Sequence, residues 1–143
     1  MSTEQASCHC GNISVEAVFT KHLSTYIPRA CDCDFCIKNG AAYISDPAGR
    51  LDIAVRNFEE ISRYRQGANL VELLICKNCG VMVAVTFADN ENLYAGLNSK
   101  TLVSRDSLAP SQVASPKSLS SPEKIKRWKE IWFSSVTVEQ APM

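Results

Sequence analysis

The cysteines constrain this chain more than any other feature. Seven of them occur within 143 residues, in three short groups. A disulfide framework would leave one cysteine unpaired, and a reducing cytosol keeps thiols free. Metal ligation is the interpretation that uses all seven. The groups are Cys8-His9-Cys10, Cys31-Asp32-Cys33-Asp34-Phe35-Cys36 and Cys76-Lys77-Asn78-Cys79.

Four of the cysteines predict a closed structural zinc site. A Cys-x2-Cys turn presents two sulfurs on one side of a loop, and two such half-sites complete a tetrahedron. Cys8 and Cys10 precede an expected strand, whereas Cys76 and Cys79 lie at the tip of an expected hairpin. The four can bind one zinc ion if these strands are neighbours.

The remaining three cysteines, Cys31, Cys33 and Cys36, predict a site of a different kind. No further cysteine is left to complete it. Catalytic zinc commonly has three protein ligands and a fourth position for water or substrate. We therefore expect two zinc ions per chain, one structural and one catalytic.

Three alternatives to this division stay open. The cysteines could be buried thiols without metal, or the three-cysteine group could be a redox thiol switch. The three-cysteine group could also be a second structural zinc site closed by another side chain. The candidates for that fourth ligand are Asp32, Asp34, His9 and His22.

Hydrophobic periodicity predicts a mainly β fold. Residues 13–19 alternate between apolar and polar, which is typical of a half-buried strand. The apolar runs 70–75 and 81–87 flank the last cysteine turn and predict a hairpin whose tip binds metal. Gly80, directly after that turn, can take a positive φ. Weaker patterns predict a short strand at 51–55 and a further strand or turn at 57–64.

The C-terminal region predicts one helix. Ser121 is an N-cap candidate followed by proline and an acid, so a helix is expected from about Pro122 to Phe133. Its apolar stripe, Ile125, Trp128, Ile131 and Trp132, is expected to pack on the core. Residues 104–121 are rich in Ser, Pro and Ala and predict an extended surface segment.

We expect one zinc-binding domain over 1–143, with a core at about 7–100 and a C-terminal wrap and helix over 101–143.

Charge and apolar content exclude several classes of partner. Fifteen basic and fifteen acidic residues give a formal net charge of zero, so neither nucleic acid nor an anionic membrane is an expected partner. The first residues carry an acid and no apolar run, unlike a secretory or transit peptide. No apolar stretch approaches the roughly 20 residues that span a bilayer. These features predict a cytoplasmic protein and leave its oligomeric state open.

The ordered motifs resemble the family of glutathione-dependent formaldehyde-activating enzymes and their relatives, which include the centromere protein V group. The likeness covers roughly residues 7 to 100. It rests on Cys8-His9-Cys10-Gly11, Cys31-Asp32-Cys33-Asp34-Phe35-Cys36, Ile61-Ser62-Arg63-Tyr64 and Cys76-Lys77-Asn78-Cys79-Gly80, in that order.

This resemblance implies an Mss4-like fold of twisted antiparallel sheets, to which the sequence adds a C-terminal helix. It also implies that Cys8, Cys10, Cys76 and Cys79 hold the structural zinc, and that Cys31, Cys33 and Cys36 hold the catalytic zinc. The activity that it implies is condensation of formaldehyde with glutathione to S-hydroxymethylglutathione, a carbon–sulfur lyase reaction when written in reverse. The implied partner is a small thiol such as glutathione.

The leading hypothesis is therefore a zinc-dependent carbon–sulfur lyase-like enzyme that acts on a small thiol adduct. The alternative is a non-enzymatic zinc scaffold or protein-interaction module.

Tyr43 and Tyr64 could donate hydrogen bonds or protons, although packing is the commoner role, and neither is assigned to the catalytic set. Glutathione carries two carboxylates, so its pocket should offer cations. Candidates near the three-cysteine group in sequence, most of them expected to be solvated, are Lys38, Arg50, Arg56, Arg63 and Arg65.

Overall fold

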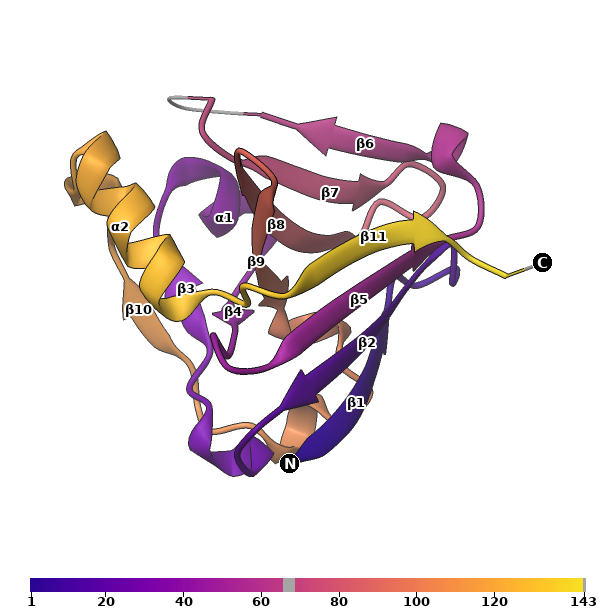
Figure 1. Cartoon of the computed structure of the whole chain (residues 1–143), viewed down its shortest axis with the longest axis horizontal. Coiled ribbons are helices and arrows are strands. Elements are labelled where there is room, and N and C mark those ends of the chain that lie inside the picture. The colour runs from indigo at the N-terminus through magenta and orange to yellow at the C-terminus, as the bar shows by residue number, and fades with distance from the viewer. Residues whose placement is uncertain (66–68, 143) are drawn as a thin grey trace.

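The computed structural model describes residues 1–65 and 69–142, which form two packed β-sheets with a helix at one side (Figure 1). The first sheet has the strand order β1-β2-β5-β11. Its neighbours are antiparallel except for β11, which runs parallel to β5. The bounds are β1 Ser2–Ser7, β2 Ile13–Phe19, β5 Arg50–Val55 and β11 Val136–Gln140.

The second sheet has seven strands in the order β10-β3-β4-β9-β8-β7-β6. These strands are also antiparallel, except that β10 runs parallel to β3. The bounds are β3 Arg29–Cys31, β4 Tyr43–Ile44, β6 Ile61–Tyr64, β7 Glu72–Cys76, β8 Met82–Asp89, β9 Asn92–Asn98 and β10 Gln112–Ala114.

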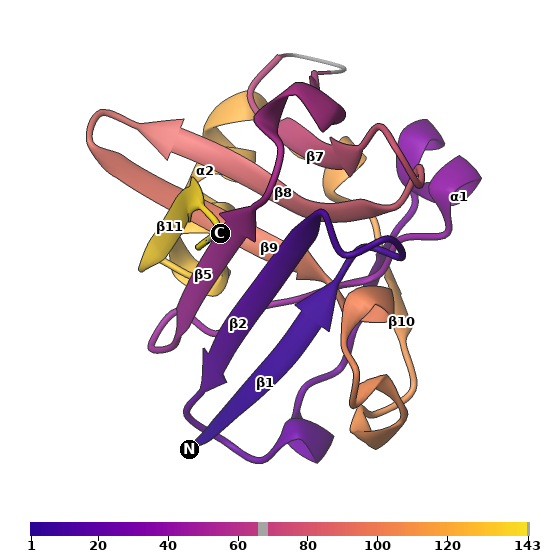
Figure 2. The same cartoon turned by 90° about the vertical axis from the view of Figure 1, so that its right-hand side faces the viewer.

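The core lies between the two sheets, which Figure 2 shows from the side of β1 and β2. Alternate residues of β2 are buried, as the period-2 pattern predicts. Ile13 and Val15 belong to the same buried cluster as Leu74 and Leu97 of the second sheet. The mainly β, Mss4-like fold is therefore confirmed, with two parallel pairs added to the expected antiparallel pattern.

Two α-helices accompany the sheets, α1 at Asp34–Asn39 and α2 at Ser121–Ile131. Neither these nor any other helix in the described residues has the length and apolar character needed to cross a membrane. Short 3-10 turns connect the other elements. They are η1 Leu23–Thr25, η2 Phe58–Glu60, η3 Ser99–Thr101, η4 Arg105–Ser107 and η5 Pro116–Ser118.

The boundaries of α2 differ from the sequence prediction at both ends. Ser120, not Ser121, is the N-cap, because its hydroxyl and the Glu123 carboxylate form a reciprocal capping box. The helix ends before Phe133, because Trp132 is extended and the Phe133 backbone pairs with Ala95. These contacts connect the end of α2 directly to β9.

The stretch 104–121 is less uniform than an extended surface segment. It contains η4 and η5, and between them β10 pairs with β3. The expected hairpin of β7 and β8 is present, with a register shift at Leu74/Ile75. Residues 57–64 form η2 followed by β6, which agrees with the expected turn and strand.

Candidate metal centres and the adjoining cavity

Cys8, Cys10, Cys76 and Cys79 form one cluster that joins the two sheets. Cys8 and Cys10 lie between β1 and β2, whereas Cys76 ends β7 and Cys79 precedes β8. All four sulfur atoms lie within 4.8 Å of one another, with Cys8–Cys10 at 3.8 Å and Cys10–Cys76 at 3.6 Å. Tetrahedral ligation with metal–sulfur bonds of about 2.3 Å separates sulfurs by about 3.8 Å. The spacing therefore fits a closed four-sulfur metal site.

Two glycines shape the turns that carry this cluster. Gly11 follows Cys10 with φ 85°, and Gly80 follows Cys79 with φ 81°, as expected for Gly80. Each glycine N–H donates to the carbonyl oxygen of the first cysteine in its turn, Gly11 to Cys8 at 3.3 Å and Gly80 to Cys76 at 2.9 Å. The two half-sites thus have similar backbone geometry despite their different cysteine spacing.

Cys31, Cys33 and Cys36 form the second cluster, on the seven-stranded sheet. Cys31 ends β3, Cys33 is the N-cap of α1 and Cys36 lies in the first turns of that helix. Their sulfur atoms also lie within 4.8 Å of one another. The Cys36 N–H donates to the Cys33 sulfur over 3.4 Å, so the helix start itself orients one thiol.

None of the four candidate fourth ligands belongs to the three-cysteine cluster in residues 1–65 and 69–142. Asp32 accepts a hydrogen bond from the Ser115 hydroxyl at 2.5 Å and lies 3.9 Å from the Lys117 ammonium. His22 caps η1 by accepting from the Ser24 N–H. His9 and Asp34 are exposed. The cluster is thus a set of three thiols.

Cys36 and Cys31 differ in proton affinity. The hydrogen bond from Cys36 lowers the pKa of Cys31 to about 6, although burial acts in the opposite direction. The same hydrogen bond raises the pKa of Cys36, and burial adds to this increase.

The pKa of the buried Tyr43 phenol is raised as well, chiefly by burial. Its oxygen lies 3.2 Å from the Cys36 sulfur. Tyr43 therefore contacts the cluster, whereas the exposed Tyr64 instead packs its ring against Phe35 at 5.3 Å.

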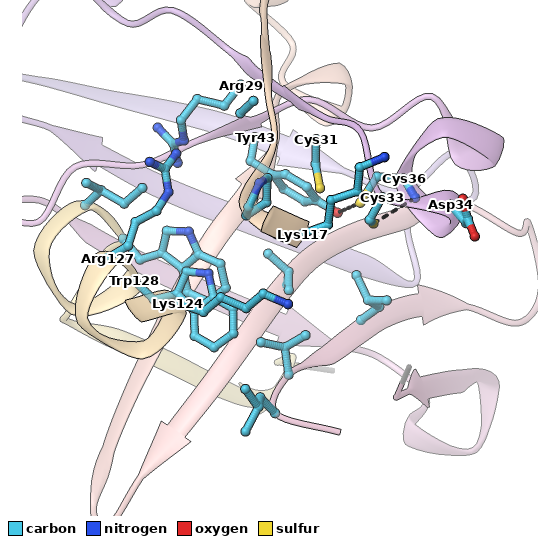
Figure 3. Close-up of a pocket in the computed structure, with 18 residues that line it drawn as sticks. Arg29, Cys31, Cys33, Asp34, Cys36, Tyr43, Lys117, Lys124, Arg127 and Trp128 are labelled. Atoms are coloured by element: carbon cyan, nitrogen blue, oxygen red, sulfur yellow. Dashed lines mark hydrogen bonds between the residues drawn. The ribbon is translucent and has the colours of Figure 1, made fainter. Parts of the chain in front are cut away.

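The three thiols open into a cavity of about 330 Å³ (Figure 3). Its walls come from three parts of the chain: β3 with α1, the inner strands of the seven-stranded sheet, and residues 114–132. The apolar wall includes Trp128 and Trp132, whose rings stack with centroids 5.0 Å apart and an interplanar angle of 19°. Both indoles are buried, as expected for a packing stripe, and they also face the cavity.

Four cations line the cavity, and none of them is among those suggested by sequence proximity. Lys38, Arg50, Arg56, Arg63 and Arg65 do not contribute to its walls. Arg50 pairs with Glu16 and Asp52 on the other sheet, and Arg63 and Arg65 pair with Glu72. The cations in the cavity wall are Arg29, Lys117, Lys124 and Arg127.

Arg29 is the most enclosed of these cations. Burial, followed by the positive charge of Arg127, lowers the pKa of Arg29 to about 10. Its guanidinium donates to the Ser45 hydroxyl at 2.8 Å, and that hydroxyl donates to the Ile131 carbonyl at 2.6 Å. β3 is thereby connected to the end of α2 through a polar chain. Arg29 stands two residues before Cys31 but was not among the predicted cations, and its proximity to α2 follows only from the fold.

These observations assign the chain to a class of mainly β proteins with one four-cysteine and one three-cysteine cluster, each able to hold a metal ion. The family model of the glutathione-dependent formaldehyde-activating enzyme matches residues 3–115, and the chain belongs to this family. A crystal structure of a Rhodobacter sphaeroides protein is similar, with a TM-score of 0.57 and 26% identity, covering 76% of this chain and 99% of the other. Comparison with the curated proteins gives no match.

Proposed function

We propose that this protein is a zinc-dependent carbon–sulfur lyase-like enzyme that acts on adducts between a small thiol and a carbonyl compound. The reference reaction, taken from the family, joins glutathione and formaldehyde to S-hydroxymethylglutathione. The observation that carries the proposal is the three-thiol cluster at the wall of a cavity with cationic and aromatic sides. A pocket of this size and composition is typical of a small-molecule site.

The donor sets favour zinc at both clusters. Thiolates in groups of three or four are ligands that zinc prefers, and no redox role is needed for the proposed reaction. In this proposal, Cys8, Cys10, Cys76 and Cys79 hold a structural zinc, and Cys31, Cys33 and Cys36 hold a catalytic one. When bound at three thiolates, zinc supplies a Lewis acid and a soft partner for sulfur.

The chain's own groups bind and orient the reactants. In the condensation, the substrate sulfur forms a bond to the carbonyl carbon, and the thiol proton ends on the former carbonyl oxygen. The lyase direction reverses both changes. The Tyr43 hydroxyl, 3.2 Å from the Cys36 sulfur, fixes that thiol in position. The stacked indoles form an apolar part of the cavity wall, and the cations attract a negatively charged thiol substrate.

A turnover assay with a conservative variant tests the proposal. Cys33→Ser removes one sulfur but keeps a side-chain oxygen that can cap α1, because serine is a favourable N-cap residue. With zinc-loaded protein, glutathione and 13C-labelled formaldehyde, NMR should show adduct formation above the spontaneous rate for the wild type. The variant should fall to the spontaneous rate.

The control for this assay is the surface variant Ser118→Ala, which lies outside the cavity wall and should retain wild-type turnover. Zinc content and circular dichroism of each protein establish that the Cys33→Ser variant is folded and has kept the four-cysteine site. Equal rates for the wild type and a folded Cys33→Ser variant would reject the proposed reaction.

A further inference from the structure

Two arginines from distant parts of the chain meet at one end of the cavity. Arg29 lies on β3 and Arg127 lies on α2. Figure 3 shows their guanidinium groups next to each other, and the positive charge of Arg127 contributes to the lowered pKa of Arg29. In the same view, Cys33 and Cys36 lie at the other end, beyond Cys31 and Tyr43. The cavity therefore has the thiols at one end, where Lys117 also lies, and two adjacent guanidinium groups at the other.

Neither arginine has an acidic partner in the described part of the chain. The side chain of Arg29 bonds only to the neutral Ser45 hydroxyl, and no ion pair includes Arg127. Asp34 lines the cavity, but Figure 3 places it at the thiol end. Two like charges in a partly buried wall repel each other, and an anion between them would offset that repulsion.

We propose that Arg29 and Arg127 form a carboxylate-binding subsite that selects small thiols bearing a carboxylate at the end remote from sulfur. Two planar guanidinium groups can each donate paired hydrogen bonds to carboxylate oxygens. The Trp128 ring beside them offers an apolar surface to the part of the ligand between its two ends. The thiol end of this assignment rests on the proposed function, whereas the carboxylate end rests on the arginines alone.

The subsite combines one residue inside the family match, Arg29, with one outside it, Arg127. The family match ends at residue 115, and Arg127 lies beyond it. Arg29 thus comes from the same strand as Cys31, whereas Arg127 comes from a separate stretch of sequence. Selection among thiols would then depend on α2, while the chemistry at sulfur depends on residues inside the matched region.

A binding experiment tests this subsite without relying on turnover. The chain has two tryptophans, Trp128 and Trp132, and both line the cavity, so intrinsic fluorescence reports on its occupancy. Zinc-loaded protein is titrated with a homologous series of ω-mercaptoalkanoates and with the matching carboxamides. The best carboxylate should bind about 10–100-fold more tightly than its carboxamide, because charge-assisted hydrogen bonds are lost in the amide.

Arg127→Gln should abolish this preference while leaving carboxamide binding unchanged. Lys126→Gln removes the same charge from the neighbouring, exposed position of α2 and should retain the preference. Arg29→Gln provides a second variant from a different element. Equal affinity of wild-type protein for carboxylates and carboxamides would overturn the inference, as would an equal loss in Arg127→Gln and Lys126→Gln.

The two proposals fail in different ways. If carboxylate preference is present and depends on Arg127, but no adduct forms above the spontaneous rate, the subsite stands and the lyase-like function fails. If adducts form equally well from carboxylates and carboxamides that bind equally, the function stands and the subsite is rejected.

Discussion

Asp46 connects three segments around the turn between β4 and β5. The side chain is buried and accepts four hydrogen bonds. One carboxylate oxygen accepts from the Thr20 N–H at 2.9 Å, the Thr20 hydroxyl at 2.6 Å and the Tyr26 hydroxyl at 2.6 Å. The other accepts from the Ala48 N–H at 2.9 Å. Burial opposes ionisation, but these donors outweigh it and lower the pKa of Asp46 to about 2.

Asp46 should therefore make stability depend on pH in the acidic range. Because its pKa is lower in the folded state than the unfolded value near 4, its contribution is present above about pH 4 and is lost as pH falls toward about 2. Asp46→Asn should lower the free energy of unfolding at neutral pH by about 2 kcal/mol, since an amide cannot accept the same set of bonds. Urea unfolding across this pH range measures both effects.

Asp106→Asn is the control for Asp46→Asn, because Asp106 is exposed and makes no side-chain hydrogen bond or ion pair in the described structure. That variant should keep wild-type stability and its pH dependence. An Asp46→Asn protein whose stability falls with acid as steeply as the wild type would contradict the assignment.

The residues of the two clusters were predictable from sequence, but the meeting of Arg29 and Arg127 in the cavity wall was not. Ligand spacing within Cys31-x-Cys33-x2-Cys36 is local, so it survives any folding of the rest of the chain. Arg29 and Arg127 are separated by most of the chain and meet only through the packing of α2 near β3. Arg29 stands two residues before Cys31 and was open to prediction from sequence proximity, whereas Arg127 was not.

At the level of the elements, α2 depends on its N-terminal cap. The Ser120 hydroxyl accepts from the Glu123 N–H at 3.3 Å, and the Glu123 carboxylate accepts from the Ser120 N–H at 2.9 Å. The Ser-x-x-Glu spacing of Ser120 and Glu123 is present in the sequence, but the sequence prediction named Ser121 as the N-cap. The capping box decides in favour of Ser120, because only that serine stands three residues before the glutamate.

Ser120→Ala should reduce stability by about 1 kcal/mol and fray the start of α2. Urea unfolding followed by tryptophan fluorescence measures the change, since both indoles lie at this helix. Ser121→Ala is the matched control: it removes the same hydroxyl one residue later and should change stability by less than about 0.5 kcal/mol. A larger effect of Ser121→Ala than of Ser120→Ala would refute the assignment of the cap.

Elements with a clear hydrophobic periodicity were predictable from sequence, whereas elements that depend on pairing with a neighbouring strand were not. β2 and β5 carry alternating apolar patterns that bury one face, whereas β8 begins with a continuous apolar run that is buried on both faces. β1 is largely polar and is ordered by its pairing with β2. α1 has six residues, too few to show a helical period, although the Cys33 cap and Gly40 at φ 70° mark its two ends.

For the whole molecule, the four-cysteine cluster lies where the two sheets meet, so a metal bound there would connect them. It joins the β1–β2 turn of one sheet to the β7–β8 turn of the other. A structural metal bound there contributes its binding free energy to folding, because the unfolded chain does not present the site preformed. The three-cysteine cluster, in contrast, involves residues within six positions of sequence and adds little to long-range order.

The two clusters should therefore respond differently to metal removal. A chelator should first remove one zinc per chain, from Cys31, Cys33 and Cys36, while circular dichroism and urea unfolding remain close to those of the loaded protein. Cys76→Ser should lose the other zinc and unfold at much lower urea concentration. Mass spectrometry of metal content, measured alongside circular dichroism, follows both events.

Cys33→Ser is the matched control for Cys76→Ser, because it makes the same substitution in the other cluster. It should lose one zinc and retain the fold. Release of both zinc ions together with loss of structure would favour the alternative of a non-enzymatic zinc scaffold.

Residues 115–135 connect strands of opposite sheets, since β10 pairs with β3 at one end and β11 pairs with β5 at the other. Anchorage at both ends allows the sequence between these strands to diverge while the cysteine frameworks stay intact. In our proposal, the part of ligand preference that depends on Arg127 can thus change separately from the cysteine clusters. If Arg127 selects the ligand as proposed, grafting this stretch between homologous proteins should alter which thiols they prefer while both clusters stay intact.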